Sequence, residues 1–205
     1  MPMTVTAITY HHVMGRWEPD ARGRLAKAAM ELYTEQGFEQ TTVAEIAARA
    51  GLTERTFFRH FADKREVLFY GMERLRDLLA RAVADAPVSA TAMDAVGAAF
   101  EAASAMFQEN PERVRLRDAI VSANAELQER ELIKLAAFAA AMAGALRDRG
   151  IPEPAASLAA ETGVAVFKVA FARWVSDPGQ PDLPAIFRES MAELKGALAD
   201  SAVGT

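Results

Sequence analysis

Two short helical patterns separated by a glycine constrain the fold of this chain more than any other feature of its sequence. The first pattern starts after Thr42, and Glu45 follows three residues later, as in the capped start of a helix. Gly51 ends this pattern, and Thr53 stands in position to cap a second pattern over residues 54–60. The spacing therefore predicts two short helices joined by a turn of only a few residues.

A longer helical pattern precedes this pair of short helices. It ends at Gly37, a residue type that is common just after the last turn of a helix. Its apolar residues recur at the three- and four-residue spacing of one helix face, and they are Leu25, Ala28, Ala29, Leu32 and Tyr33. A longer helix that braces two short helices across a tight turn is a three-helix helix-turn-helix unit.

The two faces of the second short helix differ in chemistry. At about 100° per residue, Phe57 and Phe61 are separated by only about 40°, so both are expected in the core. Arg59 lies opposite them, with Arg55 and Thr56 on either side. Guanidinium groups bind phosphates or the edge of guanine, and threonine hydroxyls reach phosphates. This face therefore suits a DNA major groove, although the same side chains taken alone also fit an ordinary solvated helix surface.

The charge of the chain is distributed unevenly. The formal net charge is −5, yet residues 22–64 hold seven Lys and Arg against six Asp and Glu. Residues 65–205 hold fifteen basic against twenty acidic side chains. A protein that binds nucleic acid through bulk charge is basic overall, so binding here depends on the placement of a few cations.

The segment TTVAEIAARAGLTERTFFRHFADKREVL, residues 41–68, resembles the helix-turn-helix of the TetR (tetracycline-repressor-like) transcriptional regulators. The resemblance extends over residues 22–72 and implies a DNA-binding head in which Arg55 and Arg59 read base edges. Phe58 stands where the family often has tyrosine, and we include it for stacking on sugar or methyl groups. The DNA-facing residues implied in this way are Thr42, Thr53, Arg55, Thr56, Phe58, Arg59, His60 and Lys64.

The remainder of the chain also has helical patterns, and the fold class predicted is all-α with about nine helices. A fourth helix is expected from Lys64 to about Asp85. Proline and glycine clusters divide the residues after it into helices near 89–108, 112–123, 125–149, 153–176 and 183–200. We expect a flexible N-terminal arm (1–18), a helix-turn-helix DNA-binding domain (19–66) and a larger ligand-binding and dimerisation body (67–205).

The family resemblance implies that the last two helices pair with those of a second copy in a four-helix bundle. Small and large apolar residues on these helices suit close packing. The candidate interface residues are Ala159, Gly163, Ala170, Trp174, Ile186, Phe187, Met191 and Leu194. The alternative is that these stripes are only the core of a single chain.

A small-molecule pocket is expected in the middle of the body, because ligand cavities are mostly apolar with few polar groups. Asn124, Arg117 and Lys168 are candidates to orient a ligand. The candidate pocket walls are Phe100, Met106, Phe107, Phe138, Met142, Phe167 and Phe171, each of which also fits a simple core position.

Several other chemistries find no support in the sequence. The chain has no cysteine, which fits a reducing cytoplasm, and it lacks the motifs of common hydrolases and phosphate-binding loops. His11 and His12 are adjacent in the arm without a nearby partner, so we expect no metal and no cofactor. The apolar run over 132–146 is too short to span a bilayer, and the N-terminus lacks the pattern of a secretory signal. We therefore expect a cytoplasmic protein that is not an enzyme and has no membrane partner.

Two functions remain open on the sequence. The first is a ligand-responsive repressor, a homodimer that binds a palindromic double-stranded operator and is released by a small, largely apolar effector. The second is a DNA-binding regulator or organiser without a small-molecule effector. A sizeable cavity in the body distinguishes the first from the second.

Overall fold

The structure, a computed structural model, describes residues 20–177, 179 and 182–203. The predicted N-terminal arm, with His11 and His12, lies outside the described residues. Within them the chain forms nine α-helices and one short 3-10 helix, with no strand, so the all-α prediction is confirmed. The helices are α1 (Ala21–Gln36), α2 (Val43–Arg49), α3 (Glu54–His60), the 3-10 helix η1 (Glu66–Phe69), α4 (Met72–Ala84), α5 (Ala92–Gln108), α6 (Pro111–Ser122), α7 (Ala125–Asp148), α8 (Ala155–Ser176) and α9 (Leu183–Val203).

Local hydrogen bonds explain where the short helices of the head begin and end. Thr42 and Glu45 form a reciprocal capping box at the start of α2, and Thr53 caps α3 by accepting from the Thr56 amide. The hydrogen bonds from Thr42 lower the pKa of the Glu45 carboxyl. Gly51 has a φ of 66° in the turn between the helices, a conformation that a residue with a Cβ rarely adopts.

The core of the head lies between α1 and the two short helices. Phe57 and Phe61 are both buried, as predicted, and their rings lie 5.6 Å apart. The hydroxyl of the buried Tyr33 donates to the Lys64 carbonyl at 2.8 Å, and burial raises the pKa of this tyrosine. These contacts fix α3 on one side only, so its opposite face remains on the surface.

The predicted fourth helix is interrupted. Instead of one helix from Lys64, the structure has η1, a break at Tyr70 and Gly71, and then α4. Gly71 has a φ of 92°, which a right-handed helix cannot contain, and this corrects the prediction of a continuous helix. The break places a short hinge between head and body.

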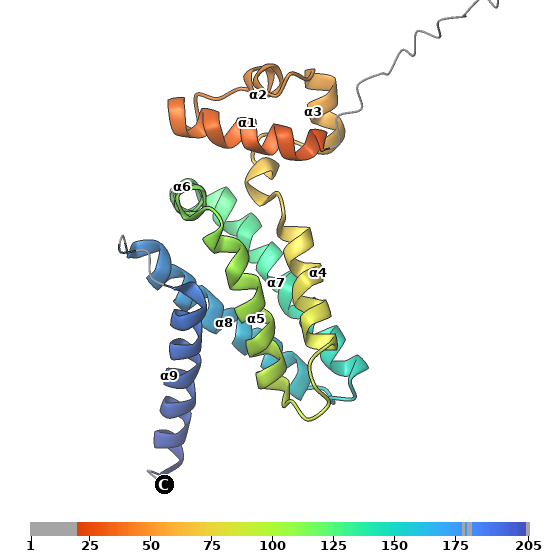
Figure 1. The fold of residues 1–205 in the computed structure, drawn as a ribbon, viewed down its shortest axis with the longest axis vertical. Helices are drawn as coiled ribbons and strands as arrows, with labels where there is room; N and C mark the ends of the chain where they lie inside the picture. The colour runs from red at the N-terminus through yellow and green to blue at the C-terminus, as the bar shows by residue number, and fades with distance from the viewer. Residues whose placement is uncertain (1–19, 178, 180–181, 204–205) are drawn as a thin grey trace, which may run out of the picture.

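The body consists of α4 to α9, below the head in Figure 1. Helices α4, α5 and α7 lie side by side, α8 packs on α5 and α7, and α9 packs on α5 and α8. The bounds of α5 to α9 lie within a few residues of those predicted from proline and glycine positions. The body therefore forms a second hydrophobic core, distinct from that of the head.

The structure places most of the predicted dimer residues inside this core. A side chain that is already buried in one chain has no surface left for a partner. Leu194 is partly buried against the same core. The seven others are buried, which corrects their assignment to a dimer interface, and they are Ala159, Gly163, Ala170, Trp174, Ile186, Phe187 and Met191.

Gly163 gives a direct test of this correction. A Cβ at this position would lie 2.2 Å from Cγ1 of Val96 and 3.1 Å from the Phe100 ring. Gly163→Ala should therefore destabilise the folded chain by about 1–3 kcal/mol, measured by chemical denaturation. Gly97→Ala on α5 is the matched control: no atom lies within 4 Å of its added Cβ, and we expect a gain of about 0.5–1 kcal/mol. Equal effects of the two substitutions would contradict this packing.

Helix α8 is the one described helix that is long and apolar enough to cross a bilayer, with a mean hydropathy of 1.4. In the structure it packs against α5, α7 and α9. Its most hydrophobic stretch is 44% buried within the chain, as in the central helix of a helical core.

Candidate nucleic-acid interface and body cavity

The exposed face of α3 carries Arg55, Phe58 and Arg59. Arg55 is three residues from Phe58 and four from Arg59, so it lies between them on one side of the helix. Phe58 is 56% exposed although it is a large aromatic residue, and its ring meets the buried Phe57 edge-on at 5.5 Å. The face therefore presents two guanidinium groups and, at its edge, an accessible aromatic ring.

The other cations of the head are engaged within the chain. Arg49 binds Glu35 through two short hydrogen bonds, which hold the pKa of that carboxyl below its usual range. Arg24 donates to the Ala50 carbonyl. Of the seven basic residues in 22–64, Arg55 and Arg59 alone have no hydrogen-bond or ion-pair partner in the described part of the chain; the five engaged are Arg22, Arg24, Lys27, Arg49 and Lys64.

Lys64 is placed differently from the expectation that it faces DNA. Its ammonium donates to the carbonyls of Phe38, Glu39 and Thr41 at 2.8–3.0 Å and lies over the Phe38 ring. All three ammonium protons are used in these bonds. Lys64 therefore closes the loop between α1 and α2, and its role is structural.

This placement yields a stability prediction. Lys64→Met keeps most of the aliphatic stem but leaves three carbonyls without their donor. We expect a loss of about 1–3 kcal/mol in the free energy of unfolding, because hydrogen bonds to charged groups contribute more than neutral ones. Arg59→Met, which removes an unpaired cation of the same head, should leave stability within about 0.5 kcal/mol. Unchanged stability of Lys64→Met would contradict the structural role.

The remaining residues expected at DNA are divided between exposed and internal positions. Thr42 and Thr53 are exposed, and each serves as a helix cap. Thr56 is half-buried, with its hydroxyl 3.0 Å from that of Thr53. His60 is half-buried, and its Nε2 is buried without a hydrogen-bond partner in the described chain. Arg55, Phe58 and Arg59 are therefore the side chains best placed to reach a groove.

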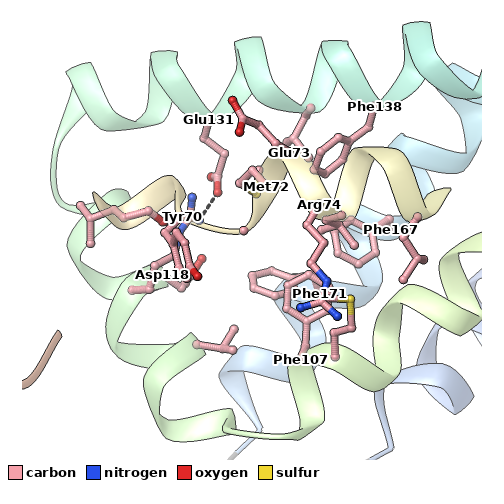
Figure 2. A pocket seen from close by; sticks show the side chains of 18 of the residues that line it. Tyr70, Met72, Glu73, Arg74, Phe107, Asp118, Glu131, Phe138, Phe167 and Phe171 are labelled. Atoms are coloured by element: carbon pink, nitrogen blue, oxygen red, sulfur yellow. Dashed lines mark hydrogen bonds and ion pairs between the residues drawn. The ribbon is translucent and has the colours of Figure 1, made fainter. Parts of the chain in front are cut away.

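A cavity of about 1600 Å³ lies in the body, between α4, α5, α6, α7 and α8, and extends up to α1 of the head. Figure 2 shows phenylalanine rings at one end of it. The rings of Phe107, Phe167 and Phe171 lie 5.6–5.7 Å from one another and form a continuous wall. Tyr70 and Gly71 of the hinge line the cavity as well, so its contents touch the connection between head and body.

Most of the predicted pocket walls line this cavity, namely Met106, Phe107, Phe138, Phe167 and Phe171. Phe100 and Met142 are not among its lining residues, which corrects their assignment. Phe100 is covered because its ring stacks on that of Phe167 at 4.9 Å, and Met142 is fully buried. Of the polar candidates, Arg117 and Lys168 line the cavity, whereas Asn124 caps the start of α7.

The other end of the cavity is charged: Arg117 was a candidate from the sequence, whereas Asp118 and Glu131 were not foreseen. Arg117 of α6 binds the Glu131 carboxylate of α7, donates to the Leu68 carbonyl and covers the Phe69 ring. Asp118, next to it on α6, also lines the cavity, and burial together with nearby Glu131 raises the pKa of its carboxyl. An apolar helix pattern gives no signal for such positions, because α6 shows no clear apolar face.

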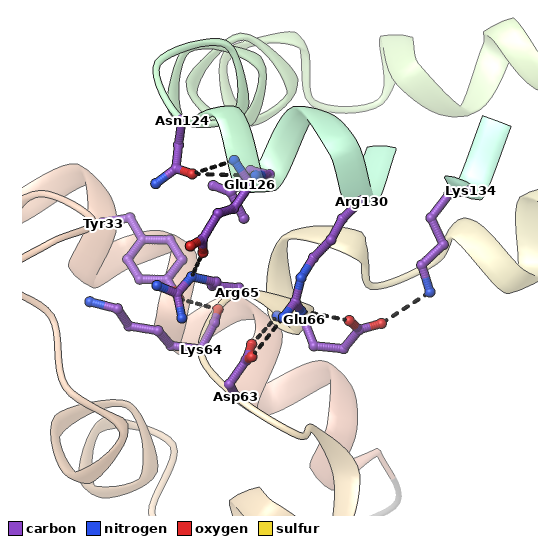
Figure 3. Close-up of polar contacts among 10 residues, drawn as sticks. Tyr33, Asp63, Lys64, Arg65, Glu66, Asn124, Glu126, Arg130 and Lys134 are labelled. Atoms are coloured by element: carbon purple, nitrogen blue, oxygen red, sulfur yellow. Dashed lines mark hydrogen bonds and ion pairs between the residues drawn. The ribbon is translucent and has the colours of Figure 1, made fainter. Parts of the chain in front are cut away.

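A network of ion pairs joins residues 63–66, at the start of η1, to α7 (Figure 3). Arg130 binds Asp63 at 3.1 Å and Glu66 at 3.4 Å, and Lys134 binds the other oxygen of Glu66 at 3.1 Å. Arg65 binds the Glu126 carboxylate at 3.4 Å. These ion pairs connect the end of the head to α7, which also forms one wall of the cavity. In the described chain no group of three His, Asp or Glu side chains could hold a metal ion.

Comparison with known proteins identifies the head. Residues 25–70 match the family described as bacterial regulatory proteins, tetR family. These residues are a TetR-family helix-turn-helix domain. The TetR-family head and the all-α body together have the fold of the solved regulators of this family.

Among curated proteins, this chain is 37% identical over 81 residues to the HTH-type transcriptional regulator TcmR of Streptomyces glaucescens. The match covers 40% of the chain and 36% of TcmR. A second relative, the HTH-type transcriptional regulator HbdR of an Aromatoleum species, is 31% identical over 28% of the chain and 25% of its own length. The chain thus spans about a third or less of these curated relatives.

Two solved structures share the fold over most of the chain. SmeT of Stenotrophomonas maltophilia, in complex with triclosan, has a TM-score of 0.62 and 24% identity over 85% of this chain and 91% of its own. FadR of Thermus thermophilus, in complex with lauroyl-CoA, has a TM-score of 0.56 and 21% identity over 83% of this chain and 91% of its own. At these identities the likeness establishes the fold of the body alone.

Proposed function

We propose that this TetR-family protein is a cytoplasmic, ligand-responsive transcriptional repressor without catalytic activity. It binds a palindromic operator as a homodimer and is released by a small, largely apolar effector. The observation that carries the proposal is that the two unpaired cations of the head lie together on the exposed face of α3. All other cations in residues 22–64 serve contacts inside the chain.

Recognition of DNA follows from the geometry of these two arginines. A guanidinium fork binds O6 and N7 of guanine through two parallel hydrogen bonds, and this contact is the commonest specific one in the major groove. Arg55 and Arg59 are one helical turn apart, so they address neighbouring base pairs. The exposed Phe58, beside Arg55 on the same face, offers an apolar contact for a thymine methyl group or a sugar.

Dimerisation is proposed through the exposed faces of α8 and α9. On α8, Leu158 and Val169 are 64% and 54% exposed, and the exposed Ala165 lies between them on the same face. On α9, Ala192 and Gly196 are exposed and one turn apart. Small residues beside large apolar ones allow two helix pairs to approach closely in a four-helix bundle. A twofold axis through this bundle would present two α3 helices to successive major grooves.

The cavity is the proposed effector site, and its position supports a switch. A ligand releases DNA only if it binds the DNA-incompetent arrangement more tightly than the competent one. The cavity reaches the hinge at Tyr70 and Gly71. Arg117 in its wall donates a hydrogen bond to the Leu68 carbonyl of η1, just before the hinge. Small molecules bound by SmeT and FadR, whose bodies share this fold, support a ligand-binding role for the body.

The ion pairs between residues 63–66 and α7 are the proposed route from the cavity to the head. A ligand that shifts α7 changes the position of Arg130 and Lys134, and with them that of Asp63 and Glu66. These ion pairs are only partly buried, so each contributes modestly and the network can rearrange without a large energetic cost. A coupling of about 1–3 kcal/mol is typical of allosteric proteins and would weaken operator binding by roughly 5- to 150-fold.

The proposed function is tested by selecting bound sequences from random double-stranded DNA with the full-length protein. We expect a palindromic site whose half-sites are spaced by about one helical turn, 34–36 Å, or a multiple of it. Enrichment of a single unpaired half-site, or of no sequence, would contradict a dimeric operator-binding repressor. The alternative, a regulator without an effector, is less favoured because the body contains a cavity of ligand size.

A further inference from the structure

We propose that the effector carries a positively charged, hydrogen-bond-donating group that binds Asp118, with its apolar part against the phenylalanine wall of the cavity. This inference rests on the proposed function, because it names the chemical class of ligand for the same cavity. It goes beyond that function in committing to a charge and to the carboxylate that recognises it.

Asp118 is a half-buried carboxylate in the cavity wall. Its neighbour Glu131 already binds Arg117, so that pair is neutral. No described side chain forms a hydrogen bond or ion pair with Asp118, although the residue is only half-exposed and lines the cavity. A partly desolvated charge without a partner is unfavourable, and a ligand that supplies the partner recovers this free energy.

The charges around Asp118 also favour a cation. Glu131 on α7 and Arg117 on the same helix α6 are the two ionic groups that act on it. With both carboxylates ionised, the three side chains carry a net charge of −1. The raised pKa of Asp118 is consistent with a carboxylate that lacks enough compensating charge.

Two of the arginines in the cavity wall, Arg117 and Arg74, are weaker sites for an anion than Asp118 is for a cation, while Arg113 is half-buried in the same wall and is the competing site that the carboxylate probe tests. Arg117 uses one terminal nitrogen for Glu131 and its Nε for Leu68; its other terminal nitrogen, Nη2, is buried without a hydrogen-bond partner in the described chain, but the charge of Arg117 is already balanced by Glu131. Arg74 lies near the aromatic end of the cavity (Figure 2), but it is exposed, so water already solvates its charge. A solvated surface charge contributes less to binding than a partly desolvated one.

The apolar part of the ligand has a defined place. Phe107, Phe167 and Phe171 form the wall at one end, and Figure 2 shows Asp118 at the other. An amphipathic molecule can place an aromatic or aliphatic body against the phenylalanine wall while its ammonium group binds Asp118. A neutral ligand of the same shape would leave Asp118 unpaired, and an anionic one would be repelled by it.

Three probes with one ring system test the charge preference: 1-naphthylmethylamine (protonated at pH 7), 1-naphthylmethanol and 1-naphthoate. Binding to the full-length protein is measured by fluorescence titration. We expect the ammonium to bind at least about 10-fold more tightly than the alcohol, and the carboxylate to bind most weakly. Equal binding of the three, tightest binding of the carboxylate, or no binding of the ammonium would overturn the proposal.

The variant Asp118→Asn assigns the preference to one side chain. We expect the preference for the ammonium over the alcohol to fall by about 10- to 100-fold, with alcohol binding unchanged. Asp77→Asn is the matched control, because Asp77 also lines the cavity but is exposed and paired with Arg76 at 2.8 Å. Loss of the preference in both variants, or in neither, would overturn the assignment.

The two proposals fail separately. If the wild-type protein binds its selected operator and is released by the alcohol or the carboxylate but not by the ammonium, the repressor function stands and the ligand class is wrong. If the wild-type protein selects no operator, the repressor function itself is wrong whatever the probes show.

Discussion

Replacing Arg55 or Arg59 with alanine should weaken binding to the selected operator by about 1–3 kcal/mol for each recognition helix, or about 2–6 kcal/mol for the dimer. Each substitution should also relax the sequence preference at one position of each half-site. The reason is that a bidentate contact distinguishes guanine from other bases, whereas a phosphate contact does not. Affinity for the operator and for single-base variants, measured at fixed salt concentration, gives both quantities.

The matched control is Lys195→Ala. It also removes one cation, but from an exposed position of the body, 3.8 Å from Asp94. We expect it to change operator affinity by less than about 0.5 kcal/mol. If Arg55→Ala and Arg59→Ala reduce binding to all sequences equally, the arginines contact phosphates and the assignment to base edges is wrong.

Val169→Asp should convert the proposed homodimer to monomers and abolish tight operator binding. The substitution places a carboxylate in each half of a symmetric apolar interface, where an unpaired buried charge costs about 3–5 kcal/mol. Sedimentation at micromolar concentration should show a monomer with unchanged helix content, because Val169 is 54% exposed in the single chain. Ala192→Asp on α9 should have the same effect.

Ile133→Asp is the control for an apolar side chain outside the proposed interface. Ile133 lies on α7 and is 63% exposed, so its substitution removes a similar apolar surface without touching α8 or α9. We expect this variant to remain dimeric. A monomeric Ile133→Asp together with a dimeric Val169→Asp would move the interface to α7 and contradict the proposed bundle.

The head could be predicted from sequence because its determinants are local. Thr42, Glu45 and Thr53 form the caps that their spacing indicates, and Gly51 has the positive φ that the tight turn requires. The 100° periodicity correctly placed Phe57 in the core. The intrachain contacts of Lys64 could not be predicted, because its three carbonyl acceptors come from a loop more than twenty residues earlier in the chain.

The body was predicted in outline only. Proline and glycine positions gave the helix bounds, but an apolar stripe does not indicate which neighbour covers it. Gly163 and Trp174 were therefore assigned to a partner, although α5 and the core of the same chain cover them. Asp118 had no recognisable pattern, since its importance arises from a cavity that five helices of the body form together.

Occupancy of the body cavity and binding of the operator are expected to oppose one another, and this antagonism is central to the proposed repressor. Calorimetric titration of a ligand that binds the cavity, first into free protein and then into the protein–operator complex, tests it directly. By linkage, the affinity for ligand must fall in the complex by the same factor as the affinity for DNA falls on ligand saturation, expected to be roughly 5- to 150-fold. Equal affinities of the ligand for free and operator-bound protein would contradict a ligand-released repressor.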